Sequence, residues 1–193
     1  MRKLEDYSFF SILCVVFTIL LLRCSMASAT NSNIVRDTCK KVEEIEPYKL
    51  VSYNFCVTVL GSDPRSSNAT TVVDLSSISI EISVSRIKSI LTTIEGLLKD
   101  PKFDPPTKSC LSACQTLYLD AQSQLSKYAM DALKKGDYGL ANDVAGGAVE
   151  MSLTCETGFE DLKRVSPPAL SKENADFYYL GGLSVFLTHI LLK

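Results

Sequence analysis

The stretch VVDLSSISIEISVSRIKSILTTIEGLLK, residues 72–99, decides the fold class. Its centre, residues 78–84, alternates apolar and polar side chains, which is also the pattern of a half-buried strand. The apolar positions nevertheless recur every three or four residues as far as Leu98, without a turn signal and beyond the length of a strand. We therefore predict one long amphipathic helix, capped by Asp74 and ended by Asp100-Pro101. Its apolar stripe is Leu75, Ile78, Ile82, Ile87, Ile90, Leu91, Ile94, Leu97 and Leu98.

Three further segments show the same periodicity and are separated by proline and glycine. The first opens at Pro105-Pro106 and ends at Lys134-Lys135-Gly136; the second runs from about Tyr138 to Val165; Ser171 is the expected cap of the third. Four amphipathic helices with short links predict an all-α, up-down-up-down four-helix bundle over residues 72–193. The expected buried stripes are Cys114, Leu117, Tyr118, Ala121, Leu125, Tyr128, Ala132 and Leu133; then Leu140, Val144, Ala148, Met151, Cys155, Phe159 and Leu162; then Phe177, Leu180, Leu183, Leu187, Ile190 and Leu191.

A glycine pair, Gly146-Gly147, interrupts the third bundle helix. Each glycine lowers helix propensity by about 1 kcal/mol relative to alanine. We expect compensation through the close approach of a neighbouring helix, with a local kink as the alternative.

Ahead of the bundle, residues 30–62 form a shorter and more polar segment. Pro47 and the Val51-Ser52-Tyr53 stretch divide them into two short helices, which predicts an N-terminal helical hairpin. Such a hairpin is too small to hold itself together, and Cys39 and Cys56 lie where a disulfide could form. In the simple chain-entropy model, closing a loop of that size contributes about 3 kcal/mol.

The first 29 residues have the features of a signal peptide. A basic start, Arg2-Lys3, precedes an apolar run that is short for a membrane span, and Ala27-Ser28-Ala29 supplies a small-x-small cleavage site. We predict cleavage after Ala29 and entry into the secretory pathway; the alternative is a retained signal anchor. In a secreted chain, the sequon Asn68-Ala69-Thr70 predicts a glycan on Asn68 if that residue is exposed.

Five cysteines remain after the leader: Cys39, Cys56, Cys110, Cys114 and Cys155. In an oxidising compartment this number indicates two disulfides and one odd thiol. Cys114 and Cys155 lie on the core-facing stripes of neighbouring helices and are a plausible pair. Cys110 lies one turn before Cys114 on nearly the same face, so it is the competitor for Cys155, a free thiol or an intermolecular partner. The residues alone leave the pairing open.

Composition and motifs argue against several functions. The leader takes three of the 20 basic and two of the 22 acidic residues, so the rest carries a net charge of −3, which gives no reason to expect nucleic acid. No catalytic or phosphate-binding motif is present, and the one histidine, His189, lies on an apolar helix where a structural role is far commoner. His189 is also too distant from the cysteines for a zinc motif. We expect no enzyme, metal or cofactor.

The apolar C-terminus, residues 180–192, admits a lipid-anchor alternative in which this tail is removed. Its stripe is amphipathic, so we prefer a core helix and expect no membrane association once the leader is cleaved.

Several short elements resemble the plant invertase and pectin methylesterase inhibitor family over essentially the whole mature chain. Its N-terminal hairpin is similar to three short stretches here: Thr38-Cys39-Lys40-Lys41, Tyr53-Asn54-Phe55-Cys56-Val57 and Leu60-Gly61-Ser62-Asp63-Pro64-Arg65-Ser66. Cys114-Gln115-Thr116-Leu117-Tyr118 with Asp120-Ala121 is similar to its C-x-x-x-Y-x-x-A element. Lys135-Gly136-Asp137-Tyr138 and Thr154-Cys155-Glu156-Thr157-Gly158-Phe159 are similar to its third bundle helix, and the nearest subgroup is that of proposed invertase inhibitors, which includes a pollen allergen.

The resemblance implies the four-helix bundle with its hairpin and the bridges Cys39–Cys56 and Cys114–Cys155. It also implies a protein inhibitor that blocks the active-site cleft of a secreted plant carbohydrate enzyme, either pectin methylesterase or acid invertase. The implied location is extracellular, in the apoplast or cell wall, with the vacuole as the alternative.

One departure from the family pattern bears on the target. Characterised invertase inhibitors carry Pro-Lys-Phe in the loop where this chain has Asp137-Tyr138-Gly139, whereas Pro101-Lys102-Phe103 falls in the preceding interhelical link. We therefore place pectin methylesterase first and invertase second, with a non-inhibitory secreted bundle, acting as a binding or abundant pollen or seed protein, as the third alternative. We expect the target to contact the polar faces of the second and third bundle helices, including Asp137 and Tyr138.

Overall fold

The computed structural model describes residues 34–46, 48 and 50–192. A helix over residues 34–45 is followed by helical elements throughout, and the described residues contain no strand. The elements are α2 (Tyr53–Ser62), the 3₁₀ turn η1 (Pro64–Asn68), α3 (Val72–Lys99), α4 (Pro105–Ser123), the π-helical turn η2 (Gln124–Ala129), α5 (Met130–Lys135), α6 (Tyr138–Asp161) and α7 (Pro168–Ile190).

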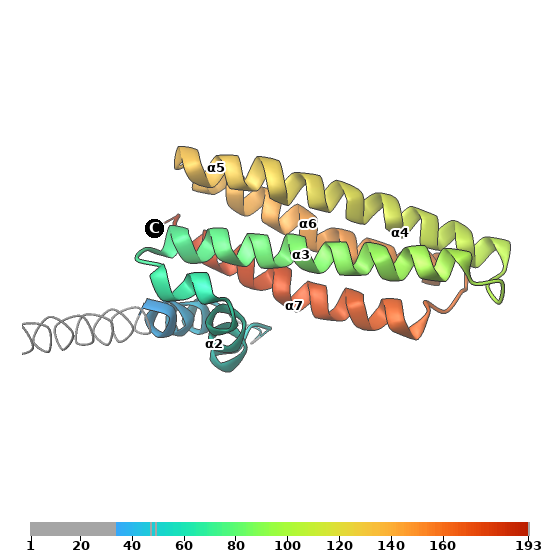
Figure 1. Ribbon diagram of the computed structural model, residues 1–193, viewed down its shortest axis with the longest axis horizontal. Coiled ribbons are helices and arrows are strands. Elements are labelled where there is room, and N and C mark those ends of the chain that lie inside the picture. Colours follow the sequence, from blue (N-terminus) through green and yellow to red (C-terminus); the bar gives the residue numbers. More distant parts are fainter. Residues whose placement is uncertain (1–33, 47, 49, 193) are drawn as a thin grey trace, which may run out of the picture.

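Four long rods form the bundle: α3, the continuous α4–η2–α5 rod, α6 and α7 (Figure 1). The helix over residues 34–45 and α2 form a hairpin beside the N-terminal part of α3 (Figure 1). This arrangement confirms the predicted all-α bundle with an N-terminal hairpin. It also decides the helix-or-strand ambiguity of residues 78–84, since α3 is helical over all 28 residues.

The helix starts differ in part from those expected. Thr71, and not Asp74, is the N-cap of α3; Asp74 lies at the third helical position and completes a reciprocal capping box with Thr71. Helix α7 begins at Pro168 after Pro167, so the expectation that Ser171 caps it was wrong. A proline at the start of a helix loses no hydrogen bond, so the prolines themselves begin the helix.

Helix α6 ends at Asp161, four residues before the predicted end at Val165. Lys163 has a left-handed φ of 51°, and the backbone N–H of Arg164 donates to the Phe159 carbonyl at 2.8 Å. This is a left-handed helix stop of the kind usually made by glycine. Because the helix has already ended, Leu162 is 54% exposed and not part of the core stripe.

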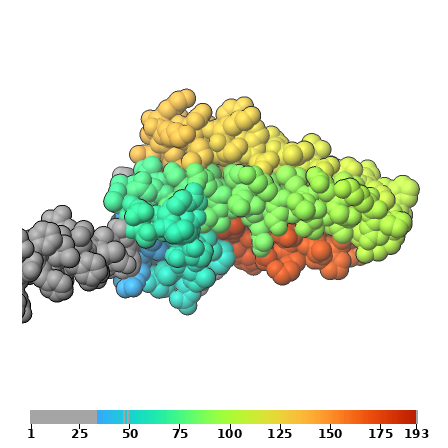
Figure 2. Space-filling view, viewed as in Figure 1, coloured from blue at the N-terminus to red at the C-terminus, as the bar shows by residue number. Residues whose placement is uncertain are grey.

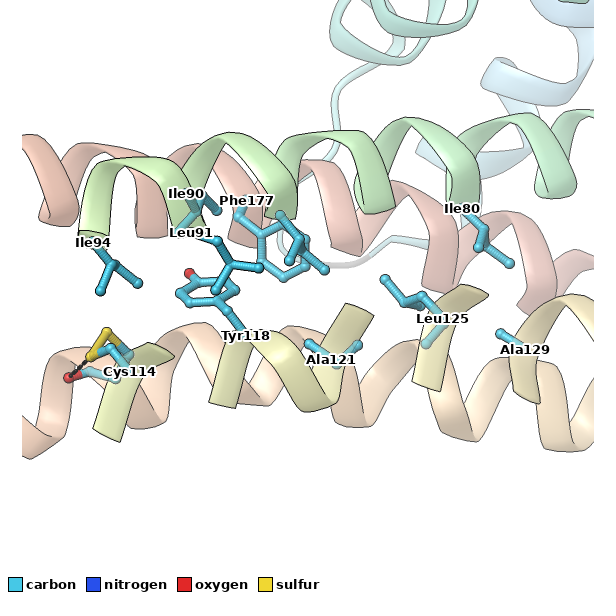
Figure 3. Packing of buried hydrophobic residues seen from close by; sticks show 14 of the residues in the cluster. Ile80, Ile90, Leu91, Ile94, Cys114, Tyr118, Ala121, Leu125, Ala129 and Phe177 are labelled. Carbon is cyan, nitrogen blue, oxygen red and sulfur yellow. Dashed lines mark hydrogen bonds between the residues drawn. A yellow bond between two sulfur atoms is a disulfide. The ribbon is translucent and has the colours of Figure 1, made fainter. Parts of the chain in front are cut away.

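The larger apolar core lies between α3, α4, α6 and α7 and has Tyr118 near its centre (Figure 3). The Tyr118 and Phe177 rings meet edge to face, with their centroids 5.6 Å apart. A second cluster joins the hairpin to α3 and α7 through Val51, Leu60, Leu75, Leu183 and Leu187. The hairpin therefore shares a core with the bundle.

The π-helical turn changes which side chains of the second rod face the core. The Met130 backbone N–H donates to the Leu125 carbonyl, a five-residue spacing that adds one residue to the turn. As a result Ala129 is buried and Tyr128 is 61% exposed, so the predicted place of Tyr128 in the core stripe was wrong.

The N-terminal half of α6 also presents a different face from the expected one. Ala141 and Ala145 are buried, whereas the predicted Leu140 is 48% exposed and Val144 only partly buried; Ala148 is buried as predicted. Small side chains at these positions let α6 lie close to its neighbours. The apolar period alone favoured the larger side chains, which lie one residue away.

The close helix contact expected at Gly146-Gly147 was also misplaced. A Cβ on Gly146 would have no heavy atom within 4 Å, and one on Gly147 would lie 3.7 Å from Gln124 Oε1, an ordinary contact. The tight glycine is Gly181 of α7, where a Cβ would lie 2.6 Å from Val149 Cγ2 of α6. Helix α6 runs through the glycine pair as one helix.

Candidate functional site

Two disulfides hold the elements that would present a binding surface. Cys39–Cys56 joins the helix over residues 34–45 to α2, with a Cα–Cα distance of 5.6 Å. Cys114–Cys155 joins α4 to α6, with a Cα–Cα distance of 4.9 Å. Both pairings are those that the family resemblance implied.

The register between α4 and α6 determines the state of Cys110. In the antiparallel pair, Cys114 lies opposite Cys155 and Cys110 lies opposite Gly158, one turn further along α6. The buried Cys110 thiol donates to the Gly158 carbonyl at 3.6 Å and makes no disulfide within the described part of the chain. Cys110 is therefore a free thiol in this structure, which is one of the three alternatives that the sequence left open.

A chain of hydrogen bonds crosses the bundle next to this disulfide. The Tyr118 hydroxyl donates to Asn174 Oδ1 at 2.5 Å, and Asn174 Nδ2 donates to Glu156 Oε1 at 2.5 Å. The Ser166 and Ser171 hydroxyls donate to the two oxygens of the same carboxylate. Burial, together with the charges of Glu156 and Glu173, raises the pKa of Tyr118 far above its ordinary value. The network ties α4, α6 and α7 together.

The tyrosine network explains the C-x-x-x-Y-x-x-A element. Cys114, Tyr118 and Ala121 are all buried on one face of α4, so the element serves the interior of the bundle (Figure 3). Asn174 was not found from the sequence, because it lies 56 residues from Tyr118. Asn174 is one of three buried polar residues of α7, with Ser184 and Thr188, so its position in the sequence did not single it out.

The proposed target-contact residues lie in the turn between α5 and α6. Gly136 has a left-handed φ of 74°, which a glycine adopts without strain, and ends α5. The exposed Asp137 carboxylate accepts from the Leu140 N–H at 3.1 Å and caps α6. Tyr138 is half-buried and packs against the larger core. Asp137 thus caps α6, whereas the Tyr138 side chain is partly accessible to a partner.

The Pro101-Lys102-Phe103 stretch lies in the link between α3 and α4, at the end of the bundle opposite the α5–α6 turn (Figure 1). Lys102 Nζ pairs with Asp100 Oδ2 at 2.8 Å and lies 5.0 Å from the centroid of the Phe103 ring. This stretch therefore lies apart from the turn that contains Asp137, and its lysine is paired within its own link.

Asn68 is the last residue of η1 and is exposed, as is Thr70. The exposure on which the predicted glycan depends is therefore present, and the glycan itself stays a prediction. The predicted leader, residues 1–29, lies outside the described residues.

His189 is exposed in the last turn of α7, and no serine, threonine or cysteine of the described chain is hydrogen-bonded to its imidazole. Within residues 34–46, 48 and 50–192, no three histidine, cysteine or acidic side chains are grouped so as to hold a metal ion. None of the helices that the structure describes is long and apolar enough to span a bilayer. Leu180, Leu183 and Leu187 of the apolar C-terminal segment are buried in the bundle.

Taken together, these features define a disulfide-bridged four-helix bundle with a helical hairpin. The model of the plant invertase/pectin methylesterase inhibitor family matches residues 33–184. The chain belongs to this family, whose members are inhibitor proteins and not enzymes.

The curated relatives carry both target names. A protein named "Putative invertase inhibitor" from Platanus acerifolia is 38% identical over 179 residues, covering 93% of this chain and 96% of its own. "Pectinesterase inhibitor 12" of Arabidopsis thaliana is 30% identical, covering 76% of this chain and 81% of its own. The relatives are thus named for both target enzymes, and these names do not separate the two.

Solved structures agree on the fold. A crystal structure of a mutant form of a pectin methylesterase inhibitor from Arabidopsis superimposes with a TM-score of 0.60 at 20% identity, covering 72% of this chain and 89% of the other. At this identity the likeness is one of fold alone.

Proposed function

We propose that the chain is secreted and acts as a stoichiometric inhibitor of a plant pectin methylesterase by covering its active-site cleft. Family membership supports the inhibitor class. The choice of enzyme depends on one observation: the α5–α6 turn carries Asp137-Tyr138-Gly139, and Pro101-Lys102-Phe103 lies at the opposite end of the bundle. An invertase inhibitor of the characterised type would carry that motif in the turn.

The rigid construction of the bundle suits this role. Two disulfides, a shared core and the Tyr118–Asn174–Glu156 hydrogen bonds order the helices before any partner arrives. A pre-ordered surface loses little conformational entropy on docking, so more of the contact energy appears as affinity.

Acid invertase is the second candidate target. The observation in its favour is the 38% identity to proteins named as invertase inhibitors from two Platanus species. We propose the apoplast and cell wall as the location. The vacuole is the alternative, because relatives at 28–30% identity are named cell wall or vacuolar inhibitors of fructosidase.

A titration of both enzymes tests the proposal. The secreted chain, with its disulfides intact, is added to purified pectin methylesterase and to acid invertase over a pH range from mildly acidic to neutral. Saturating loss of pectin methylesterase activity at a one-to-one ratio, with invertase unaffected, is the expected result. The reverse pattern establishes invertase as the target, and the loss of neither activity by a folded chain overturns the inhibitor proposal for these two enzymes.

Variants of the α5–α6 turn test the proposed contact. Tyr138→Ala is expected to weaken inhibition, whereas Tyr48→Ala, at an 89% exposed tyrosine of the hairpin and outside the second and third bundle helices, is the control. A melting curve for each variant shows that the fold is intact. Equal inhibition by both variants and the parent chain would remove Tyr138 from the contact surface.

A further inference from the structure

A groove of about 690 Å³ lies between the hairpin and the bundle. Residues of α2 and the start of η1 form one wall, and residues of α3 and α7 form the other. In Figure 2 it corresponds to the corner where the hairpin meets α7 below α3. This volume is within the range of sites that hold small ligands.

The first component of the groove is a set of charged groups held in fixed orientations. Arg65 donates through Nε and Nη2 to the two oxygens of Asp63 at 2.9 and 2.7 Å, and through Nη1 to Glu81 of α3. On the opposite wall, Arg86 Nη2 donates to Asp176 Oδ2 of α7 at 2.7 Å. The hydrogen bond from Arg65 lowers the pKa of Asp63, which favours its ionised form.

These groups keep hydrogen-bonding capacity that faces solvent. The Arg65 side chain is 50% exposed, and those of Glu81 and Asp176 are 44% and 36% exposed. The lining contains three carboxylates and two guanidinium groups, so it has no excess of positive charge. Both Asp63 oxygens accept from Arg65, whereas among the described residues Glu81 Oε1 and Asp176 Oδ1 accept no hydrogen bond. A guanidinium group has five N–H donors, so each arginine also keeps N–H groups beyond those that its carboxylate partners engage.

The second component is an apolar surface beside these charges. Tyr179 is 44% exposed and meets Tyr178 edge to face, with a centroid separation of 6.0 Å. Phe55 of α2 lines the facing wall. Two aromatic side chains therefore flank a floor of hydrogen-bonding groups.

We propose that this groove is a binding site for a short neutral oligosaccharide. A hexose ring has an apolar C–H face that packs on an aromatic side chain and adjacent hydroxyls that both donate to carboxylates and accept from guanidinium groups. Hydrogen bonds to charged partners are roughly twice as strong as neutral ones. The lining of the groove comes from this chain alone, so the proposed sugar binding does not depend on which enzyme the chain inhibits.

Other ligand classes fit the groove less well. An anionic ligand would meet three carboxylates and only two guanidinium groups, so the net charge of the lining opposes it. A purely apolar ligand would remove these five charged groups from water without replacing their hydrogen bonds, which is costly. A neutral polyhydroxylated ligand avoids both costs.

The test is an NMR titration of the isotope-labelled secreted chain with cellotriose, xylotriose and sucrose as neutral probes, and trigalacturonate as the charged one. We expect saturable shifts of backbone amides on both walls for at least one neutral probe, with a dissociation constant of about 1 mM or lower. Tyr179→Ala is expected to weaken binding by about three- to tenfold, as expected for the loss of one aromatic contact, whereas Tyr179→Phe retains binding.

Tyr128→Ala is the matched control, since Tyr128 is an exposed tyrosine on another rod and lies outside the groove. The proposal is overturned if no neutral probe gives saturable shifts up to about 20 mM, or if the Tyr128→Ala and Tyr179→Ala variants lose binding equally. Tighter binding of trigalacturonate than of every neutral probe would also overturn it. Because no target enzyme is present, these outcomes are separate from those of the inhibition assay.

Discussion

Gly181 of α7 lies so close to Val149 of α6 that a Cβ on the glycine would be 2.6 Å from Val149 Cγ2. The ring of Phe177 closes the same space, 3.8 Å from the position of that Cβ. Glycine is thus required at residue 181 for the separation of these two helices, and the contact sets how closely α7 packs on the bundle.

The first prediction concerns this contact. Gly181→Ala adds a methyl group to a filled space, which typically costs about 1–3 kcal/mol and outweighs the gain of up to about 1 kcal/mol in helix propensity. We expect a lower free energy of unfolding in chemical denaturation. Gly146→Ala, with no atom within 4 Å, is the control and is expected to be stabilising.

A double variant sharpens this test. Val149→Ala removes the methyl group that the new side chain would strike, so the Val149→Ala/Gly181→Ala pair is expected to be less destabilised than the sum of the single changes. Additive effects would show that the two residues do not compete for the same space.

The second prediction concerns Tyr118. Tyr118→Phe leaves Asn174 Oδ1 buried without its donor, which we expect to cost about 1–3 kcal/mol of stability. The Tyr118 pKa is raised in the folded state, so the stabilisation is fully present below the ordinary tyrosine pKa of 10.0 and is lost as the pH rises above it. The unfolding free energy of the parent chain should therefore fall more steeply above pH 10 than that of the variant.

Measurement of unfolding by denaturant between neutral and alkaline pH checks both parts. Tyr128→Phe, at a 61% exposed tyrosine, is the control and should leave the unfolding free energy unchanged at neutral pH. Parallel pH profiles for the parent chain and Tyr118→Phe would contradict the role given to burial.

The third prediction concerns the cysteines. The mature secreted chain, unfolded without reductant, should show one reactive thiol, which Cys110→Ser abolishes while both disulfides remain. A chain that keeps its leader adds Cys14 and Cys24, so the thiol titre also reports on cleavage. A mature chain with no thiol would mean that Cys110 is paired.

The two disulfides should differ in their contribution. In the chain-entropy model, removal of Cys114–Cys155, with a separation of 41 residues, costs about 4 kcal/mol, against about 3 kcal/mol for Cys39–Cys56, with a separation of 17. Denaturation of the paired Cys→Ser variants measures the order. A larger loss from the hairpin bridge would show that hairpin docking supports the whole bundle.

The fourth prediction concerns the end of α6. Lys163 adopts a left-handed φ of 51°, which costs a residue with a side chain about 1–2 kcal/mol. Part of this cost is offset by the greater freedom of glycine in the unfolded chain, so Lys163→Gly should stabilise the protein by about 0.5–1 kcal/mol. The reciprocal change, Gly136→Ala at φ 74°, should destabilise it, and thermal unfolding checks both signs.

The fifth prediction concerns Asn68, which is exposed at the end of η1. Expression of the full chain in a secreting eukaryotic host should yield a product whose mass falls by one discrete step in Asn68→Gln. Enzymatic removal of glycans from the parent chain should give the same step. Identical masses for parent and variant would show that the sequon is not used.

Local information was sufficient for the fold class. The helices were predicted from the apolar period of residues 72–99, the prolines near residues 101, 105 and 167 and the glycine at 136. These signals act on the chain close to them, so they can be read without reference to the rest of the sequence. The resemblance in the hairpin and in the Cys114–Tyr118–Ala121 element then implied the two bridges and the class of inhibitor. Helix ends were missed by up to four residues, because caps and left-handed stops compete on small energies.

Tertiary structure decided what depends on the relation between helices. The register of α4 against α6 placed Cys110 opposite Gly158. The π-helical turn buried Ala129 in the core in place of Tyr128. Close helix packing required glycine at residue 181 and not at 146 or 147. Tertiary structure also brought Arg65, Glu81 and Tyr179 to one groove, although they are far apart in sequence. The physical reason is that periodicity specifies which face of a helix is apolar, whereas the distance and register between two faces depend on the side chains of both.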